Sequence, residues 1–151
     1  MSIKKNLTLG GNLFTIGLLE NEDMPALYPL IEALNPGMQQ SLFEERLAEM
    51  QANKFNCIGV WLDDKLIACC GFWILIKFYN GRHVEPDNVA VLSDYRNFGL
   101  GQIMMDFLHE HARSLGCTVS ELNAYVSNNK AHKFYFKDDY KILGFHFRKE
   151  L

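Results

Sequence analysis

The stretch Asp87–Gly116, DNVAVLSDYRNFGLGQIMMDFLHEHARSLG, indicates how the rest of the chain is arranged. Residues 88–92 alternate between apolar and other side chains, as a strand does. From Ile103 onward the apolar residues recur with the spacing of one helix face. The pattern ends at Gly116, where a left-handed residue can terminate a helix. The sequence therefore predicts a strand, a tight turn at residues 96–101 and an amphipathic helix.

The predicted turn, Arg96-Asn97-Phe98-Gly99-Leu100-Gly101, has the composition of an anion-binding site. The first turn of a helix carries unpaired N–H groups and the positive end of the helix dipole. Gly99 and Gly101 lack the side chains that would keep a ligand away from this backbone. The turn is therefore expected to bind a phosphate or pyrophosphate, with Arg96 adding positive charge.

Two common phosphate-binding motifs do not describe this turn. A P-loop requires GxxxxGK[ST], which is absent. A Rossmann fingerprint requires GxGxxG directly after the strand, but here a longer turn intervenes and Met104 stands in place of the third glycine. The pattern that fits fully is Arg-x-x-Gly-x-Gly, formed by Arg96, Gly99 and Gly101.

This pattern resembles motif A of the GNAT acetyltransferases, in which the turn holds the pyrophosphate of acetyl-CoA. A second segment, NNKAHKFY at residues 128–135, resembles motif B of the same family, N-x-x-A-x-x-F-Y. The family pattern continues with a glycine, where this chain has Asp139. That position requires a positive φ, which Asp tolerates better than most residues. An alternative alignment to Gly144 would require extra residues after Tyr135.

The composition limits the classes of function. A chain of 151 residues with 48% hydrophobic content is expected to form one domain over residues 1–151. A net charge of −3 argues against nucleic-acid or anionic-membrane partners. We see no apolar run of membrane-spanning length and no secretory signal, and we expect a cytoplasmic protein. The four cysteines form no CxxC, so we expect buried free thiols and no metal site.

The segments before residue 87 predict a β-meander with two early helices. Strands are expected at 12–19, 55–62, 66–78 and 82–91, with a hairpin at Asn80-Gly81. Helices at 23–34 and 41–50 are expected to shape an acceptor pocket, and later segments predict a strand at 118–126, a helix from 128 or 129 to 136 and a strand at 140–148. The expected fold class is α/β (α+β) with the GNAT fold, whose mixed, mostly antiparallel sheet has about six to seven strands flanked by about four helices.

The resemblance implies an N-acetyltransferase that moves the acetyl group of acetyl-CoA, its cosubstrate, to a primary amine of a small molecule or peptide by direct attack. Tyr135 takes the family's tyrosine position, which implies a general acid. The alternative is a packed aromatic, because Phe134 and Phe136 flank it. A phenol, unlike phenylalanine, can donate a proton.

The amine must lose a proton before it attacks, since its ordinary pKa is about 10.4. Glu85 and Asp87 share one strand face and are the candidate base, acting as a carboxylate–water relay. Glu121 and His83 are further candidates.

The other implied site residues bind the cofactor. Backbone N–H groups of Val89 to Val91 would face the thioester carbonyl as preorganised donors. Asn128 would bind the pantetheine arm or cap a helix, and both roles can coexist. The expected cofactor-binding residues are Val89, Ala90, Val91, Arg96, Asn97, Phe98, Gly99, Leu100, Gly101, Gln102, Asn128 and Lys130.

Two other functions remain open at this level. The same fold could serve as a non-catalytic acyl-CoA-binding sensor or interaction module, and an NAD-binding oxidoreductase is a weaker alternative. The acceptor is not encoded by any spacing, because loops carry specificity. An open sheet edge would allow a homodimer.

Overall fold

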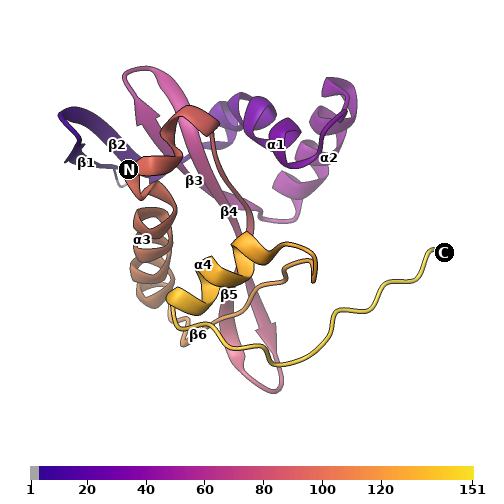
Figure 1. Cartoon of the computed structure of the whole chain (residues 1–151). Coiled ribbons are helices and arrows are strands. Elements are labelled where there is room, and N and C mark those ends of the chain that lie inside the picture. Colours follow the sequence, from indigo (N-terminus) through magenta and orange to yellow (C-terminus); the bar gives the residue numbers. More distant parts are fainter. Residues whose placement is uncertain (1–3) are drawn as a thin grey trace. The chain divides into compact units, whose positions relative to one another are not determined.

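The computed structural model describes residues 4–151 and divides at Glu121 into two compact units. The first unit ends at Glu121 and carries the β-sheet with the helices up to α3 (Figure 1). The second unit comprises Leu122–Leu151 and carries helix α4, Asn129–Lys137. Each unit is described by itself below.

The described residues of the first unit form a six-stranded mixed sheet in the order β1-β2-β3-β4-β5-β6. Neighbours from β1 to β5 are antiparallel, and β6 is parallel to β5. This order confirms the predicted β-meander. The strands are β1 Lys4–Leu9, β2 Asn12–Leu18, β3 Asn56–Leu62, β4 Lys65–Lys77, β5 Gly81–Val91 and β6 Val119–Ser120.

Helices cover both faces of this sheet (Figure 1). Phe72 and Trp73 are adjacent in β4 and therefore point to opposite faces. The Phe72 ring lies 5.8 Å from His111, and the Trp73 ring lies 5.1 Å from Phe55. His111 belongs to α3, whereas Phe55 follows α2. The helices are η1 Asn21–Leu27, α1 Tyr28–Leu34 and α2 Gln40–Ala52 on one face, and η2 Ser93–Phe98 followed by α3 Leu100–Ser114 on the other.

The core lies between the sheet and each helical layer. Apolar side chains of α1 and α2 pack on the sheet as one cluster, and the predicted amphipathic helix α3 buries its apolar stripe on the opposite face. The first cluster is Leu19, Met24, Leu27, Leu30, Phe43, Leu47, Phe55, Cys57, Cys69 and Ala90. The buried residues of α3 are Leu100, Met104, Met105, Phe107, Leu108 and Ala112.

Two hairpins of the sheet use glycine residues with a positive φ. Residues 78–80 connect β4 to β5, and Gly81 supplies the positive φ of 66°, which confirms the predicted hairpin. The predicted strand at 12–19 is confirmed as β2, but it is the second strand and not the first, because β1 precedes it. Gly10 and Gly11 have φ values of 55° and 80° and join β1 to β2. A Gly-Gly pair is a known two-residue hairpin signal, so the sequence itself carries the cue for this turn.

The last two predicted strands differ from the structure. The strand expected at 118–126 is reduced to Val119–Ser120, and residues 140–148 form no strand among the described residues. Alternating side chains mark a segment that can be a strand, but a strand also needs a neighbouring edge for its backbone hydrogen bonds. The helix between these segments is confirmed, and Asp139 just after it has the expected positive φ of 62°.

Strand β5 contains a bulge opposite β4. Ala90 pairs with Cys69, and Asp87 pairs with Gly71, so Asn88 and Val89 together face one residue of β4. Asn88 has a φ of 53°, a left-handed conformation that asparagine tolerates. Bulges bend a strand and change the direction of its side chains and amides. The predicted strand at 82–91 is therefore confirmed in extent but is irregular at Asn88.

A polar network joins the β4–β5 hairpin to the end of β6. The Tyr79 hydroxyl donates to Glu121 Oε2 at 2.7 Å, and Lys77 Nζ donates to the same oxygen at 3.4 Å. The fully buried His83 places Nε2 3.7 Å from this oxygen. Burial alone would raise the pKa of the Glu121 carboxyl, but the hydrogen bonds from Tyr79 and Lys77 outweigh it and lower the pKa.

We predict that Gly71→Ala destabilises the protein by about 1–3 kcal/mol, the usual range for overpacking a core. A Cβ at Gly71 would lie 2.5 Å from the Phe55 ring and 2.8 Å from the Asp87 carbonyl oxygen. Urea denaturation measures the loss. Gly144→Ala is the control, because a Cβ there meets nothing within 4 Å. Equal stabilities of the two variants would contradict the prediction.

A second prediction concerns the pH dependence of stability. Because folding lowers the pKa of Glu121 below its ordinary value of 4.5, its carboxylate stabilises the folded state above that pH. This contribution disappears as the pH falls through the lower, folded-state value. The wild type should therefore lose stability more steeply than Glu121→Gln on acidification below pH 4.5. Thermal unfolding across a pH series tests this, and parallel curves would refute it.

Candidate active site

The predicted anion-binding turn forms the entry to α3. Gly99 is the N-cap residue with a φ of 72°, and no side chain caps the helix. The Ile103 N–H donates to the Gly99 carbonyl at 3.3 Å, so the amides of residues 100–102 precede the helical hydrogen-bond ladder. A Cβ at Gly99 would meet nothing within 4 Å. This open backbone, rich in donors, has the geometry that suits a phosphate or pyrophosphate group.

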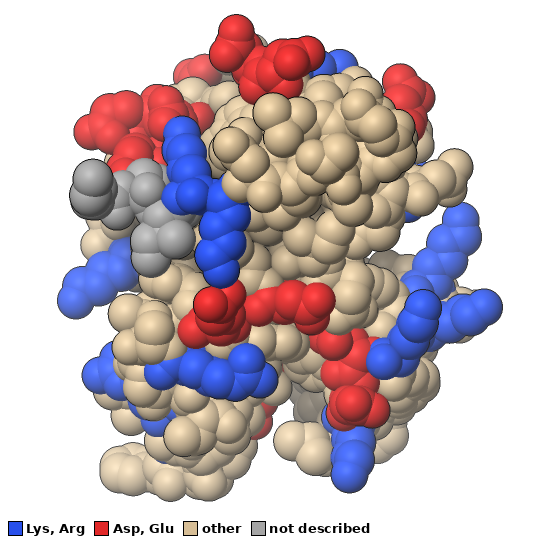
Figure 2. Space-filling model, turned by 90° about the vertical axis from the view of Figure 1, so that its left-hand side faces the viewer, with Lys and Arg blue, Asp and Glu red and all other residues tan. Residues whose placement is uncertain are grey.

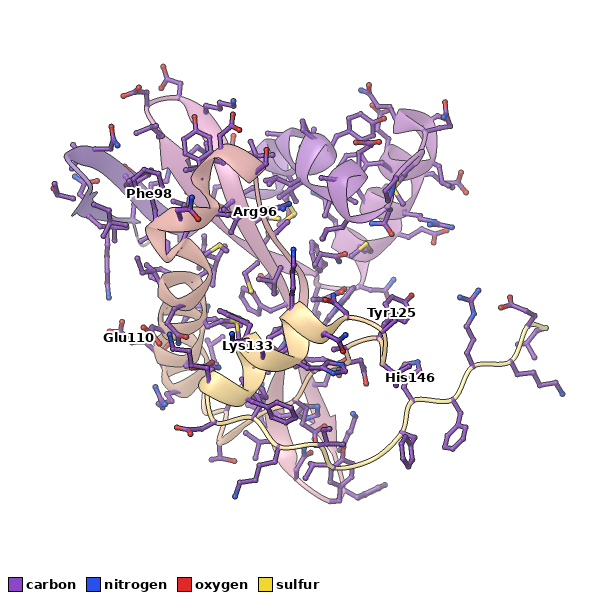
Figure 3. All side chains as sticks on the ribbon, in the orientation of Figure 1. Arg96, Phe98, Glu110, Tyr125, Lys133 and His146 are labelled. Atoms are coloured by element: carbon purple, nitrogen blue, oxygen red, sulfur yellow. The ribbon has the colours of Figure 1, made fainter. Side chains whose placement is uncertain are left out.

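Arg96 and Phe98 lie on η2, just ahead of this helix (Figure 3). Arg96 Nε donates to the Val91 carbonyl at 3.1 Å, which ties the turn to the end of β5. The bond uses one of five guanidinium N–H groups, so others can bind an anion. The Phe98 ring packs at 5.5 Å against Phe14 in β2. Phe98 therefore anchors the turn to the sheet through its side chain.

The remaining residues of the turn differ in whether their side chains are buried or exposed. Leu100 is buried in the core, so only its backbone can face a ligand. Asn97 is exposed, and Gln102 donates from Nε2 to Asp106 Oδ1 at 3.1 Å. Sequence reasoning had grouped these residues as ligand contacts. The structure assigns Phe98 and Leu100 to packing by their side chains.

The edge of β5 next to β6 is paired over a short length. β6 pairs with β5 only at His83 and Val84. Among the described residues of the first unit, no other strand pairs with this edge farther along β5. Val89, Ala90 and Val91, the expected oxyanion donors, lie on this segment, Val89 within the bulge and the other two just after it. Ala90 is buried, and its neighbours are half-buried.

The two candidate catalytic carboxylates have different surroundings. Asp87 Oδ2 accepts a hydrogen bond from Trp73 Nε1 at 3.2 Å, on the face covered by α1 and α2. Glu85 Oε2 lies 4.0 Å from Lys77 Nζ, on the side of the hairpin network. The shared strand face was predicted correctly. The sequence could not show that Asp87 and Glu85 interact with different residues in different parts of the unit.

Asp87 also lines a cavity of about 270 Å³ between the early helices and the sheet. The cavity is bounded by side chains of η1, α1, α2 and the β5 bulge, where the sequence had suggested an acceptor pocket. Its lining residues are Leu27, Ile31, Asn35, Met38, Phe43, Arg46, Leu47, Met50, Phe55, Asp87 and Asn88. A second cavity of about 520 Å³ is lined by Trp61, Asp63 and Asp64 among others, and contains none of the candidate site residues.

The second unit contains the other candidate residues. Asn128 is the N-cap of α4, and its Oδ1 accepts from the Ala131 N–H at 3.1 Å. The half-buried Tyr135 ring lies 5.2 Å from Phe134 and 5.6 Å from Tyr140. Lys130 is exposed. The capping role predicted for Asn128 is confirmed, and its amide N–H groups are still available to a ligand.

The cysteines are buried free thiols, as predicted. Burial raises the pKa of Cys70, with neighbouring Cys69 and Asp87 adding to the effect. A hydrogen bond with Cys69, together with burial, raises the pKa of Cys57. Because the thiolate is the reactive form, these cysteines are poor nucleophiles.

The surface charge is mixed. On the face shown in Figure 2, acidic and basic side chains are interspersed. None of the helices described in residues 4–151 is long and apolar enough to cross a membrane.

Comparisons with known proteins agree with the two motifs. The chain is 23% identical over 134 residues to an uncharacterized N-acetyltransferase, YhdJ, of Bacillus subtilis, covering 87% of this chain and 94% of that relative. It is 33% identical over 105 residues to the amino-acid acetyltransferase of Pasteurella multocida, covering 68% of this chain but 22% of the relative.

The fold is similar to that of solved acetyltransferases. An aminoglycoside acetyltransferase, meta-AAC0020, from an uncultured soil sample superposes with a TM-score of 0.78 at 18% identity, covering 91% of this chain and 96% of the other. The expected GNAT fold is thereby confirmed. The family model for GNAT acetyltransferases matches residues 20–140, which include both motifs. The chain therefore belongs to the GNAT family of N-acetyltransferases, which use acetyl-CoA.

Proposed function

We propose that this N-acetyltransferase acetylates a primary amine of a small molecule or peptide by direct attack. The observation that carries the proposal is the open turn at Gly99, which presents helix amides and is tied by Arg96 to the end of the bulged strand β5. The similarity to an amino-acid acetyltransferase supports a small amine as acceptor. Bound acetyl-CoA supplies the acetyl group in activated form, as a thioester.

We assign cofactor binding mainly to backbone groups. The amides of residues 99–102 would bind the pyrophosphate, and the unused guanidinium donors of Arg96 would add charge. Backbone N–H groups of Val89, Ala90 and Val91 would stabilise the oxyanion. In the second unit, Asn128 would donate from its amide while its oxygen caps α4. Asn97 and Lys130, both exposed, would lie at the rim of the site.

Asp87 is the proposed group that receives the proton of the amine. It lines the cavity, and Trp73 occupies one of the roughly four acceptor positions of its carboxylate. Glu85 would extend the relay through water on the same strand face. General bases of this kind contribute about 10²–10⁴-fold to rate.

Tyr135 is the proposed general acid. It is the one phenol among the consecutive rings of α4, and it occupies the family's tyrosine position. The hydroxyl would supply the proton that the departing sulfur takes up.

The extent of the domain and the location of the protein are also part of the proposal. The family match at residues 20–140 crosses the boundary at Glu121, which supports one acetyltransferase domain over residues 1–151. The buried free thiols support a cytoplasmic location. The open edge of β5 and β6 would allow a homodimer.

The proposal predicts that Gly99→Trp abolishes acetyl-CoA binding, because an indole would fill the open turn. Isothermal calorimetry with acetyl-CoA, and with NAD as a ligand control, measures this. Gly11→Trp is the matched control, since Gly11 also has a positive φ of 80° and open space around it. If wild type fails to bind acetyl-CoA, or a folded Gly99→Trp binds it normally, the assignment of the turn is wrong.

Tyr135→Phe should lower kcat by about 10²–10⁴-fold with little change in the Kd of acetyl-CoA, because it removes a proton donor and keeps the ring. Tyr125→Phe is the control, as Tyr125 is an exposed tyrosine of the same unit (Figure 3). Steady-state kinetics with a reactive amine measure both variants. An unchanged kcat would assign Tyr135 to packing. Tight binding by wild type without turnover of any amine would favour the sensor function.

A further inference from the structure

The acceptor cavity has walls of two chemical kinds. Most of its lining is apolar, and four side chains are polar or charged. The apolar residues are Leu27, Ile31, Met38, Phe43, Leu47, Met50 and Phe55, and the others are Asn35, Arg46, Asp87 and Asn88. At roughly 30 Å³ per water, the volume of about 270 Å³ holds about nine water-sized groups. A ligand body of this size is comparable to one amino acid.

The charged residues come from opposite layers of the first unit. Asp87 belongs to β5, on the sheet side, and keeps most of its acceptor capacity beside Trp73. Arg46 belongs to α2, on the helix side. It lines the cavity together with Phe43, Leu47 and Met50 of the same helix, and Phe43 and Met50 lie three and four residues away from it.

Arg46 is the cavity's one cationic side chain. It is also the one basic residue of α2, whose Glu44, Glu45 and Glu49 do not line the cavity. Within residues 4–151, Arg46 makes no hydrogen bond or ion pair. Its guanidinium geometry suits a carboxylate or another planar anion.

We propose that the acceptor is a primary amine with a compact apolar body and an anionic group, of which the apolar α-amino acids are the simplest class. This inference rests on the proposed acetyltransferase function. Asp87 faces the ammonium, Arg46 binds the anion, and the apolar wall between α1, α2 and Phe55 binds the side chain. Arg46 is thus a specificity-determining residue. A neutral amine of the same shape leaves Arg46 without a partner.

Matched amines test each part of this proposal. Leucine and isoamylamine share the same apolar body, but only leucine has the carboxylate, while glycine has the carboxylate without the apolar body. With saturating acetyl-CoA, kcat/KM should be highest for leucine. Arg46→Gln should lower kcat/KM for leucine by about 10- to 100-fold, as expected for a lost charged hydrogen bond, and leave that for isoamylamine nearly unchanged. Arg46→Glu should reverse the preference towards isoamylamine.

Arg113→Gln is the control, because Arg113 is an exposed arginine near the end of α3 and does not line the cavity. Equal use of leucine and isoamylamine by wild type overturns the inference, as does an equal loss for both amines in Arg46→Gln. Acetyl-CoA binding without turnover of any of the three amines also overturns it. Calorimetry on the same samples distinguishes a failure of the acceptor inference from a failure of the acetyltransferase proposal. A wild type that does not bind acetyl-CoA refutes the acetyltransferase proposal itself.

Discussion

The irregular pairing of β4 with β5 is the constraint on which the rest of the structure depends. β5 has one residue more than β4 between Asp87 and Ala90, so its backbone bends at Asn88. Gly71 permits this geometry, because its missing side chain leaves room for Phe55 and for the Asp87 carbonyl. The hydrogen-bond ladder on both sides of the bulge holds this irregular backbone in place.

The two parts of the candidate site, the cavity and the turn, both lie at the bulged end of β5. Asp87 points to the face of α1 and α2, where the proposed acceptor cavity lies. Beyond the bulge, Val91 accepts a hydrogen bond from Arg96, and Phe98 packs on Phe14. These two contacts hold the turn at Gly99 against the sheet. The proposed acceptor cavity and the predicted anion-binding turn are therefore fixed to the same short piece of β5.

A polar network lies at the other end of the β5 edge, around one buried histidine. His83 is fully buried beside Glu121, and Tyr79 and Lys77 reach the same carboxylate from the hairpin. Partly buried carboxylates are stable when donors surround them. This network lies where β6 stops pairing with β5, so it stabilises the start of the unpaired edge of β5.

The sequence alone determined the meander, the helix after the turn, the hairpin at Gly81 and the family, because glycine positions and apolar spacing are local properties of the chain. It also located Gly99 and the positive φ of Asp139. Only the tertiary structure decided which site residues use their side chains for packing, as Phe98 and Leu100 do, and that Asp87 and Glu85 have separate partners. It alone brought Arg46 to the same cavity as Asp87, and in it the described residues 140–148 form no strand. The physical reason is common to these cases. Periodicity tells which side of its own element a residue occupies, whereas a cavity, an ion pair or a strand partner depends on elements that are distant in the sequence.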